Sequence, residues 1–403
     1  MYKRTNGVYN LFNSNSFHYQ ALRTLGHSAY QGSAPGEVLY VISQIKDQDE
    51  DAWYVEWNKM GEKCENWANE TTDPKTKGNA LLRASNYFRT SEFFLPIRDT
   101  KKLKVYDRHV TDFEMALVEL GIKHTIFNIP YEKGKMKTYY FKGDTDKPLV
   151  LVCGGFDSTN TESYFWIGKA LIDRGYSVAM FEGPGQSAML RHFNIKFTPG
   201  WHKPVGIVID YLIIKDPSVQ AKKKVLFGIS LGGLLMGRAA AFEKRIDGVA
   251  LFGGPFDFFD SALYQIPSIA RKLFYSGHKK TLNFLANIKM KISITARWGI
   301  NNGIASMGGQ SPYEFLSIGK NFTLKDVNDK VTCPVIVFYG THDLFVADGI
   351  QDAMFKNAFK NAKSYTLKTF PFEDGSSEHC QAGSIEQSAM VFVQWMKDQK
   401  LVK

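Results

Sequence analysis

One serine in this chain stands where a nucleophile would be expected. The apolar run 225–229 leads into the pattern G-I-S-L-G at 228–232, and an Ala- and Leu-rich segment follows at once. That order predicts a strand, a tight turn and a helix, and glycines on both sides of Ser230 leave a strained turn the room it needs. We interpret the pattern as a nucleophile elbow. The alternative is a glycine-rich turn with a structural serine.

A serine hydroxyl becomes nucleophilic only beside a base, and the base needs a carboxylate that orients it. In the fold that carries this elbow, the acid and then the histidine follow the serine along the chain. Of the nine histidines, only His342 and His379 come late enough. His379 lies in the loop "FEDGSSEHCQAG" between the last predicted strand and the last predicted helix, so we predict it as the general base. The alternative is an ordinary loop histidine.

The orienting acid is predicted from its place after a strand. Asp343 directly follows the apolar run "VIVFYG", and the carboxyl ends of parallel strands face the functional edge of an α/β sheet. We predict that Asp343 orients His379, although a strand-end aspartate can also simply cap a helix. Asp257 and Asp260, in "GGPFDFFDSAL", are rivals for the acid role, and either could instead face a substrate.

An acyl-transfer site also needs amide donors for a tetrahedral oxyanion. The amide of Leu231, at the start of the helix after the elbow, is one expected donor. The segment "LVLVCGGFDST" ends a predicted strand, and its two glycines let the backbone approach a substrate. We predict the amide of Phe156 as the second donor; the alternative is a plain glycine turn.

No cofactor and no metal are expected. The segment "FEGPGQS" at 181–187 contains only part of the dinucleotide fingerprint, so a nicotinamide cofactor is not predicted. The four cysteines are far apart and lack the paired spacings of zinc sites or small disulfide frameworks. They are expected to be reduced thiols.

The elements that must position these residues fall into two parts. Residues 1–120 are predicted as a helical N-terminal cap domain, because apolar residues recur there at helical spacing. Residues 121–403 are predicted as a catalytic domain in which strands and helices alternate, with crossover helices at 163–174 and 350–360 and a helical insertion at about 256–330. Eight strands are predicted, at "KHTIFNIP", "MKTYYFKG", "PLVLVCGG", "SVAMFEG", "KVLFGIS", "GVALFGG", "PVIVFYG" and "SYTLKTF". Apolar runs without alternation indicate a mostly parallel sheet covered by helices on both faces.

Composition narrows the function class. The formal charge is +10, but the lysines are scattered and lack the interleaved aromatic and arginine residues of nucleic-acid readers, so no nucleic-acid partner is predicted. A weak attraction for acidic substrates stays open. No apolar run is long enough to span a membrane, and the first residues lack the apolar core of a signal peptide. We expect a soluble, cytoplasmic protein without a membrane partner.

The assembled motifs resemble the α/β-hydrolase superfamily, and within it a cytoplasmic group with a helical N-terminal domain. That group includes 2,6-dihydropseudooxynicotine hydrolase, the fungal heptaketide hydrolases, bacterial polyketide-shortening enzymes and the fermentation/respiration switch protein. The resemblance covers most of the chain and rests on "LLRASNYFRTSEFFL", "GGFDSTNTESYFW", "FEGPGQS", "GISLGG", "WGINNGIASMGGQSPYEFL", "GTHDLFV" and "EHCQAG". Where the family has "FDGPGQG", this chain has Glu182 and Ser187.

The resemblance implies a hydrolase of small acyl compounds with Ser230, Asp343 and His379 at the family's triad positions. In several members of the group the bond broken is carbon–carbon, in a β-dicarbonyl or polyketide-like substrate. A carboxylesterase or thioesterase, and a regulator that keeps the fold without using the triad, are the alternatives. The resemblance also favours a homodimer. Aromatic residues of the N-terminal helices and of the insertion could form an apolar substrate pocket, although each of them singly could instead belong to the core. The candidates for substrate contact are Arg83, Tyr87, Asp157, Asp257 and Asp260, and Arg83 could instead form a surface or interdomain salt bridge.

Overall fold

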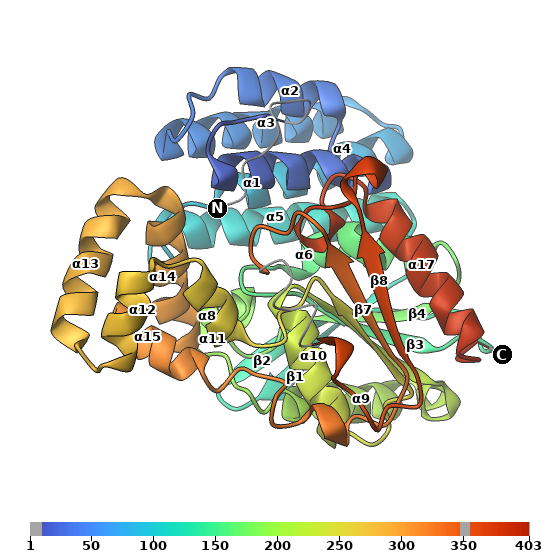
Figure 1. The fold of residues 1–403 in the computed structure, drawn as a ribbon. Helices are drawn as coiled ribbons and strands as arrows, with labels where there is room; N and C mark the ends of the chain where they lie inside the picture. Colours follow the sequence, from blue (N-terminus) through green and yellow to red (C-terminus); the bar gives the residue numbers. More distant parts are fainter. Residues whose placement is uncertain (1–9, 347–354, 403) are drawn as a thin grey trace. The chain divides into compact units, whose positions relative to one another are not determined.

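The computed structural model describes residues 10–346 and 355–402. The chain divides into two compact units, one ending at Ile122 and the other beginning at Lys123 (Figure 1). The first unit is built from helices alone in its described part, and the second combines a sheet with helices.

Five α-helices make up the described part of the helical unit. They are α1 (Asn15–Gly26), α2 (Pro35–Ser43), α3 (Glu50–Glu70), α4 (Pro74–Ser91) and α5 (Thr100–Glu119). Aspartates start the three long helices: the side chains of Asp49, Asp73 and Asp99 accept hydrogen bonds from backbone amides in the first turn of α3, α4 and α5. Such caps satisfy amides that have no partner within the helix.

Aromatic side chains form the centre of the helical unit. The ring of Trp53 packs against Phe17, Trp57 and Phe94, with centroids 4.7 to 5.7 Å apart. Rings at such separations combine a large buried apolar area with a favourable edge-to-face or tilted contact. The helical spacing of these residues in the sequence is therefore explained by the core of this unit.

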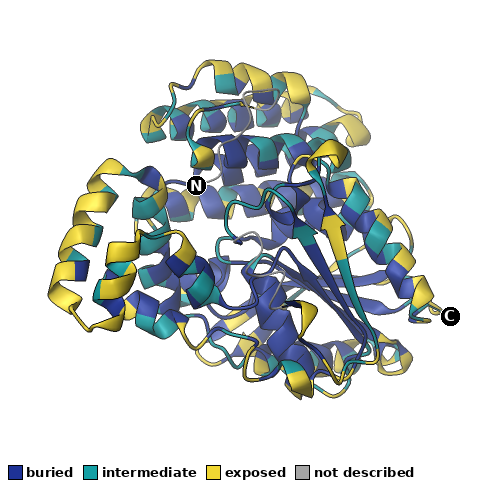
Figure 2. Ribbon diagram, in the orientation of Figure 1, coloured by how far each residue is buried: buried dark blue, intermediate teal, exposed yellow. Residues whose placement is uncertain are grey.

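The α/β unit contains an eight-stranded sheet in its described residues. The strands are β1 (Thr125–Tyr131), β2 (Gly134–Phe141), β3 (Leu149–Cys153), β4 (Ser177–Phe181), β5 (Lys224–Ile229), β6 (Gly248–Phe252), β7 (Val335–Gly340) and β8 (Tyr365–Phe370). Their order in the sheet is β1-β2-β4-β3-β5-β6-β7-β8. The β1–β2 and β2–β4 pairs are antiparallel, and the other pairs are parallel. The central strands β3 to β6 are buried along their whole length (Figure 2).

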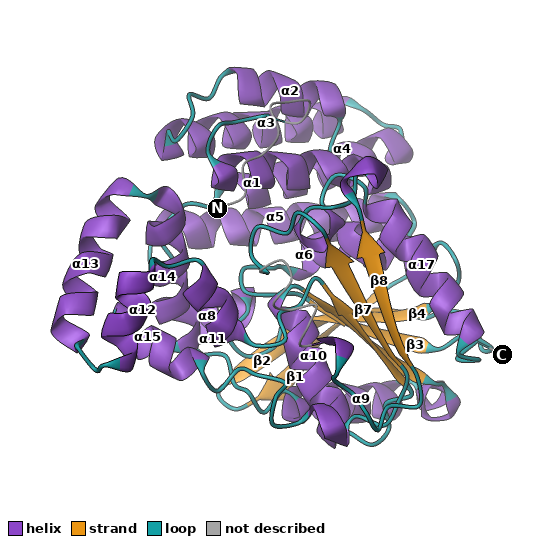
Figure 3. Ribbon diagram, in the orientation of Figure 1, coloured by secondary structure: helices purple, strands orange, loops and turns teal. Residues whose placement is uncertain are grey.

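Helices cover both faces of the sheet (Figure 3). They are α6 (Asn160–Ser163), α7 (Lys169–Ile172), α8 (Ser187–Phe193), α9 (His202–Lys215), α10 (Leu231–Phe242) and α17 (Ile385–Asp398). Successive residues of β5 point to opposite faces: Leu226 joins the core cluster that includes α10, while the ring of Phe227 packs on Phe392 of α17, with centroids 4.8 Å apart. The sheet is thus buried between two helical layers.

Five further α-helices lie between β6 and β7. They are α11 (Phe258–Tyr264), α12 (Ser268–Tyr275), α13 (Lys279–Ile292), α14 (Ile294–Met307) and α15 (Pro312–Gly319). We call this segment the helical insertion.

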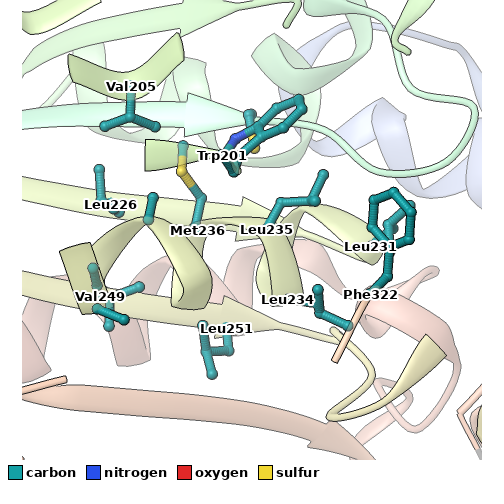
Figure 4. Packing of buried hydrophobic residues seen from close by; sticks show 14 of the residues in the cluster. Trp201, Val205, Leu226, Leu231, Leu234, Leu235, Met236, Val249, Leu251 and Phe322 are labelled. Atoms are coloured by element: carbon teal, nitrogen blue, oxygen red, sulfur yellow. The ribbon is translucent and has the colours of Figure 1, made fainter. Parts of the chain in front are cut away.

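The helix after the predicted elbow is held in the centre of the core. Leu231, Leu234, Leu235 and Met236 of α10 are buried against Leu226, Leu251 and neighbouring side chains (Figure 4). Burying one such side chain stabilises the fold by about 1.5–3 kcal/mol. A helix that is apolar on nearly all sides in this way is fixed in place, and so is the turn from which it starts.

The structure confirms the predicted fold class, a mostly parallel α/β sheet with helices on both faces and a helical N-terminal region. The predicted crossover helix at 163–174 is interrupted: a π-helical stretch at Tyr164–Gly168 separates α6 from α7. The other predicted crossover helix, at 350–360, lies partly outside the described residues. In the described part of the chain, no helix is long and apolar enough to cross a membrane.

Candidate active site

Ser230 occupies the sharp turn between β5 and α10. Its backbone angles are φ 56° and ψ −129°, a conformation that side-chain-bearing residues rarely adopt. Such strain costs on the order of 1–3 kcal/mol and persists only where the surroundings enforce it. Two backbone hydrogen bonds do so: the Ser230 amide donates to the carbonyl of Phe252 at 2.8 Å, and the Gly233 amide donates to the carbonyl of Ser230 at 2.8 Å.

Both glycines of the G-x-S-x-G pattern are required for steric reasons. A Cβ atom at Gly228 would lie 2.1 Å from the carbonyl oxygen of Gly232, and one at Gly232 would lie 2.4 Å from the carbonyl oxygen of Gly154. Real Cβ contacts are never so short, so no side chain fits at either position. The motif is therefore required by backbone packing around Ser230, as the sequence predicts for an elbow.

His379 lies within hydrogen-bonding distance of both partners predicted for it. Its Nε2 is 2.8 Å from Ser230 Oγ, and its Nδ1 is 2.6 Å from Asp343 Oδ2. The loop that carries His379 is tied to the end of β7, because the amide of His342 donates to the carbonyl of Ser377 at 2.9 Å. The structure thus brings Ser230, His379 and Asp343 into one hydrogen-bonded chain.

Asp343 is fixed by its second carboxylate oxygen. Oδ1 accepts hydrogen bonds from the amides of Phe345 and Val346, at 2.8 and 2.9 Å, while Oδ2 faces His379. The Asp343 side chain is 1% exposed. With both oxygens engaged and water excluded, the carboxylate holds the imidazole in the orientation that leaves Nε2 toward the serine.

The electrostatics of His379 favour a strong base. Burial by itself would lower the pKa of this imidazole, but the adjacent Asp343 carboxylate outweighs burial, and the pKa of His379 lies well above its ordinary value. A neighbouring negative charge and a hydrogen bond to it both favour the protonated ring. His379 is therefore poised to accept a proton from the serine hydroxyl.

The rival acids have other partners. Asp257 caps α11 by accepting a hydrogen bond from the amide of Asp260 at 2.8 Å. Lys325 lies 3.2 Å from the Asp257 carboxylate and 2.6 Å from that of Asp260. Of the three aspartates considered for the acid role, Asp343 is the one that the structure places within hydrogen-bonding distance of His379.

The predicted oxyanion loop lies against the serine turn. A Cβ atom at Gly155 would be 2.7 Å from Ser230 Cβ and 3.0 Å from the amide nitrogen of Leu231. The next residue, Phe156, is partly exposed, as is Ser230 itself. Leu231 is the first residue of α10, so its amide has no acceptor within the helix and belongs to the positive end of the helix dipole.

Two polar side chains form hydrogen bonds with the backbone of this loop. Gln186 is buried, and its Nε2 donates to the carbonyl of Gly154 at 2.5 Å while its Oε1 accepts from the amide of Gly183 at 2.8 Å. The hydroxyl of Ser158 accepts from the amide of Gly155 at 2.8 Å. These bonds fix the backbone on both sides of the Gly154–Gly155 peptide.

Glu182, which stands where the family has aspartate, joins two helix starts. One carboxylate oxygen accepts from the amide of Asn160 in α6, and the other accepts from the amide of Ala188 in α8, both at 2.8 Å. The side chain is buried. Its charge at two helix N-termini is favourable, so this departure from the family pattern has a structural role beneath the site.

The helical insertion reaches the oxyanion loop through Asn302 of α14. Its Nδ2 donates to the carbonyl of Phe156 at 3.2 Å. The ring of Phe156 also packs on Phe258 and Trp298 of the insertion and on Phe197, with centroids 5.8 to 6.5 Å apart. An aromatic cluster therefore surrounds one of the two predicted oxyanion donors.

Two predicted substrate contacts are engaged inside the helical unit. Tyr87 is fully buried; its hydroxyl donates to Glu37 at 2.6 Å and accepts from the amide of Ala34 at 2.9 Å. Arg83 Nε donates to the same Glu37 oxygen at 3.0 Å. Because the Glu37 carboxylate binds the polar groups of both side chains, neither Tyr87 nor Arg83 belongs to the proposed site. Asp157 is partly exposed beside Phe156.

Sequence reasoning missed Gln186 and Asn302. Both lie in quoted motifs, "FEGPGQS" and "WGINNGIASMGG", as polar residues within largely apolar or glycine-rich segments. That context is the signal that could have marked them, since a buried amide needs a partner. The four cysteines are free and buried. Among the described residues, no group of three or more His, Cys, Asp and Glu side chains is placed to hold a metal ion.

The strand order and the turn at Ser230 define an α/β-hydrolase, and comparisons with known proteins agree. The family model described as esterase FrsA-like matches residues 41–266. The 20-hydroxy-prefusarin hydrolase FUS2 of Gibberella moniliformis is 30% identical over 361 residues, which cover 84% of this chain and 86% of the relative. The hydrolase acrC of Aspergillus aculeatus is 29% identical and covers 84% and 85%. This chain therefore belongs to the FrsA-like esterase family and is an α/β-hydrolase enzyme.

Solved structures share the fold. The 2,6-dihydroxy-pseudo-oxynicotine hydrolase superposes with a TM-score of 0.71 at 20% identity, covering 93% of this chain and 95% of that structure. AbyA5 superposes with a TM-score of 0.68 at 15% identity and covers 96% of each chain. The resemblance seen in the sequence is confirmed at the level of fold and family.

Proposed function

We propose that this protein is a serine hydrolase in which Ser230 is the nucleophile, His379 the general base and acid, and Asp343 the residue that orients His379. The observation that carries the proposal is the unbroken chain of hydrogen bonds from Asp343 Oδ2 through His379 to Ser230 Oγ, at 2.6 and 2.8 Å. A binding protein has no physical need for all three groups in this geometry, whereas nucleophilic catalysis needs each of them.

The reaction proceeds through an acyl-enzyme. His379 Nε2 takes the proton of Ser230 Oγ as the oxygen attacks the substrate carbonyl carbon. The oxygen of the tetrahedral adduct accepts hydrogen bonds from the amides of Leu231 and Phe156. The adduct collapses, the leaving group takes the proton from His379, and water deprotonated by the same imidazole then hydrolyses the acyl-enzyme.

For the leaving group, we propose a stabilised carbanion from a β-dicarbonyl or polyketide-like substrate. Ser230 Oγ adds to one ketone carbon, and the bond from that carbon to the activated carbon beside it breaks. The electron pair remains on the activated carbon as an enolate, which the imidazolium protonates, and one water releases the acyl group as a carboxylic acid. The aromatic rings of Phe156, Phe197, Phe258 and Trp298 beside the donor loop suit an apolar or aromatic substrate.

Ester or thioester hydrolysis is the second candidate. The family's description as an esterase favours it, and the same residues would act on an easier leaving group. A regulatory role without catalysis is the third hypothesis, and the intact triad geometry argues against it.

The first experiment asks whether Ser230 is a reactive nucleophile. The full chain is incubated with a fluorophosphonate probe, beside Ser230→Ala and the matched control Ser276→Ala, which replaces an exposed serine. We expect labelling of the native chain and the control, and none of Ser230→Ala. Labelling that survives in Ser230→Ala, or its absence from the native chain, contradicts the proposal.

A second experiment separates the two leaving groups. A β-diketone and an ester with the same acyl group are offered to the native chain, and products are identified by mass spectrometry. Cleavage of the diketone into an acid and a ketone that depends on Ser230 supports carbon–carbon hydrolysis. Turnover of the ester alone favours the esterase.

The remaining predictions concern the oligomeric state, the cellular location and the domain roles of the enzyme. We propose a homodimer in the cytoplasm, with residues 1–120 acting as a cap domain and a small molecule as the substrate. Light scattering on the protein as it elutes from a size-exclusion column tests the dimer, and subcellular fractionation tests the location.

A further inference from the structure

The outer side of the helical insertion carries apolar side chains that no other part of the described chain covers. On α13, Phe284 is 64% exposed, Ile288 43% and Ile292 72%. Together with Leu285 they form a stripe along one side of the helix at spacings of three, four and seven or eight residues, the spacings of a single helix face. Exposed large apolar residues gathered on one face mark an interaction site. Figure 2 shows α13 exposed along its outer side.

This stripe is separate from the face that holds α13 in the fold. Leu282 is buried, and Ala286 and Met290 are half-buried, at a spacing of four residues. With 100° of rotation per residue, the direction of that inner face lies far from that of the Phe284–Ile292 stripe. The helix therefore has an inner apolar face that anchors it and an outer one that is left for a partner.

Lysines flank the outer stripe on both sides. At the same rotation per residue, Lys280 and Lys291 lie beside one edge and Lys289 beside the other, and all three are exposed. Long lysine side chains can rest their carbon stems on an apolar surface while their ammonium groups reach polar surroundings. An apolar stripe bordered by lysines is typical of a helix that lies in the plane of a membrane surface.

The segment that contains α12 and α13 carries charge of one sign. Residues 261–313 contain seven Lys and Arg residues and no Asp or Glu, so this segment carries +7 of the chain's net +10. On α12, Ile269 and Tyr275 are exposed apolar residues, and Arg271 and Lys272 are exposed basic ones. The sequence alone indicates only scattered solvated lysines, because it does not show that they surround an apolar stripe.

We infer that the outer face of α13 binds an anionic lipid surface, with the stripe of Phe284, Leu285, Ile288 and Ile292 entering the boundary of the acyl chains and the lysines contacting phosphate or carboxylate head groups. A nucleic acid offers charge but no apolar surface for the stripe. A second copy of this chain would oppose its own positive face, and like charges facing each other disfavour that contact. Anionic lipid matches both features.

Such attachment has a consequence for the enzyme. The chain passes from the end of α13 into α14 with only Ser293 between them, and α14 carries Trp298 and Asn302, which contact Phe156. The lipid-binding face and the oxyanion loop are therefore linked through one short segment. Apolar substrates that dissolve in the membrane would be concentrated where the enzyme binds. This surface was not expected from the sequence, which predicts no membrane partner.

The test is sedimentation of the full chain with lipid vesicles, either of phosphatidylcholine alone or of phosphatidylcholine mixed with phosphatidylserine. We expect at least about ten-fold stronger binding to the anionic vesicles, falling as salt is added. Phe284→Ser with Ile288→Ser, and separately Lys289→Glu with Lys291→Glu, should each reduce binding about ten-fold or more. The matched controls are Ile214→Ser, an apolar residue 75% exposed on α9, and Lys133→Glu with Lys135→Glu, two exposed lysines near the β1–β2 turn.

Three outcomes overturn the inference. One is native binding that does not depend on anionic lipid. Another is control variants that lose as much binding as the α13 variants. The third is a native dimer that Phe284→Ser with Ile288→Ser converts to a monomer in light scattering, which would make this face an interface between copies. Thermal melting of each variant checks its folding. Because vesicle binding is measured equally well on Ser230→Ala, failure of the proposed catalysis leaves this test intact.

Discussion

Each of the two units contains a buried histidine with a displaced pKa, and the two displacements have opposite directions. In the helical unit, His27 is 1% exposed, and burial together with the positive charges of Arg23 and Arg89 lowers its pKa to about 3, although a hydrogen bond with Asn86 opposes the shift. In the α/β unit, His379 is 5% exposed, yet the carboxylate of Asp343 raises its pKa well above the ordinary value.

The difference teaches that burial does not decide what a histidine does. Burial disfavours the charged ring in both places, and the neighbouring charges then determine the outcome. Arginines around His27 keep it neutral and inert, a polar group that completes a core. The carboxylate of Asp343, with a smaller contribution from Cys380, raises the pKa of His379, and its ring points at a partly exposed hydroxyl. The following predictions test this contrast between a structural and a reactive histidine.

The largest effect is expected from Ser230→Ala. Removing the proposed nucleophile should reduce kcat by about 10⁵-fold or more, because the triad acts as a unit and Ser230 Oγ lies 2.8 Å from His379 Nε2. Hydrolysis of an activated ester measures it, with Ser276→Ala as the control. If kcat fell less than ten-fold, His379 would activate a group other than the Ser230 hydroxyl.

Asp343→Asn should follow, with a loss of about 10⁴-fold in kcat, because an amide in place of the carboxylate favours the wrong tautomer of His379. In the native enzyme, kcat/KM should fall as pH decreases through the raised pKa of His379, at a pH above 6.5, since the protonated ring cannot accept the serine proton. Without the Asp343 charge, the largest influence that raises the pKa of His379 is lost, so the remaining activity should show this acid limb at lower pH.

Asp257→Asn and Asp260→Asn serve as matched controls, because the sequence offers both aspartates as alternatives for the acid role and both pair with Lys325. Each should keep kcat within a few-fold of the native value. If Asp257→Asn lowered kcat as much as Asp343→Asn does, the carboxylate of Asp343 could no longer explain the difference between His379 and His27.

A smaller effect is expected from Asn302→Ala. In the proposed mechanism we expect Asn302 to act through the loop as a positioning residue, since its amide donates to the carbonyl of Phe156. Loss of this bond should lower kcat about ten-fold with little change in KM, because the oxyanion donor matters most in the transition state. The exposed neighbour Asn301→Ala is the control. An equal change in KM and no change in kcat would indicate a substrate contact instead.

How far the sequence predicts this molecule depends on the range of the interactions. The eight strands and the elbow follow from local patterns: apolar runs, and glycines whose missing side chains the packing requires. Ser230, His379 and Asp343 are predicted because the fold imposes their order along the chain. The Asn302 contact is not, since it joins backbone and side chain 146 positions apart. The hydrogen bond from the Tyr87 hydroxyl to Glu37 is not predicted either, because it also joins residues far apart in the sequence.

The smallest effect on activity, and the sharpest test of the contrast, concerns His27. Its folded-state pKa of about 3 lies below the unfolded value near 6.5, so the unfolded chain takes up a proton that the folded unit does not. The stability contributed by neutral His27 is therefore complete above pH 6.5 and is lost as pH falls from there toward about 3, by up to about 1.4 kcal/mol per pH unit. Hydrogen exchange of α4 amides, compared with β5 amides at pH 7 and 5, measures it for each unit. His27→Gln should weaken the pH dependence of amide protection in α4, leave the protection of β5 unchanged and keep the native kcat. If the pH dependence of protection in α4 does not change in His27→Gln, His27 is protonated in the folded unit.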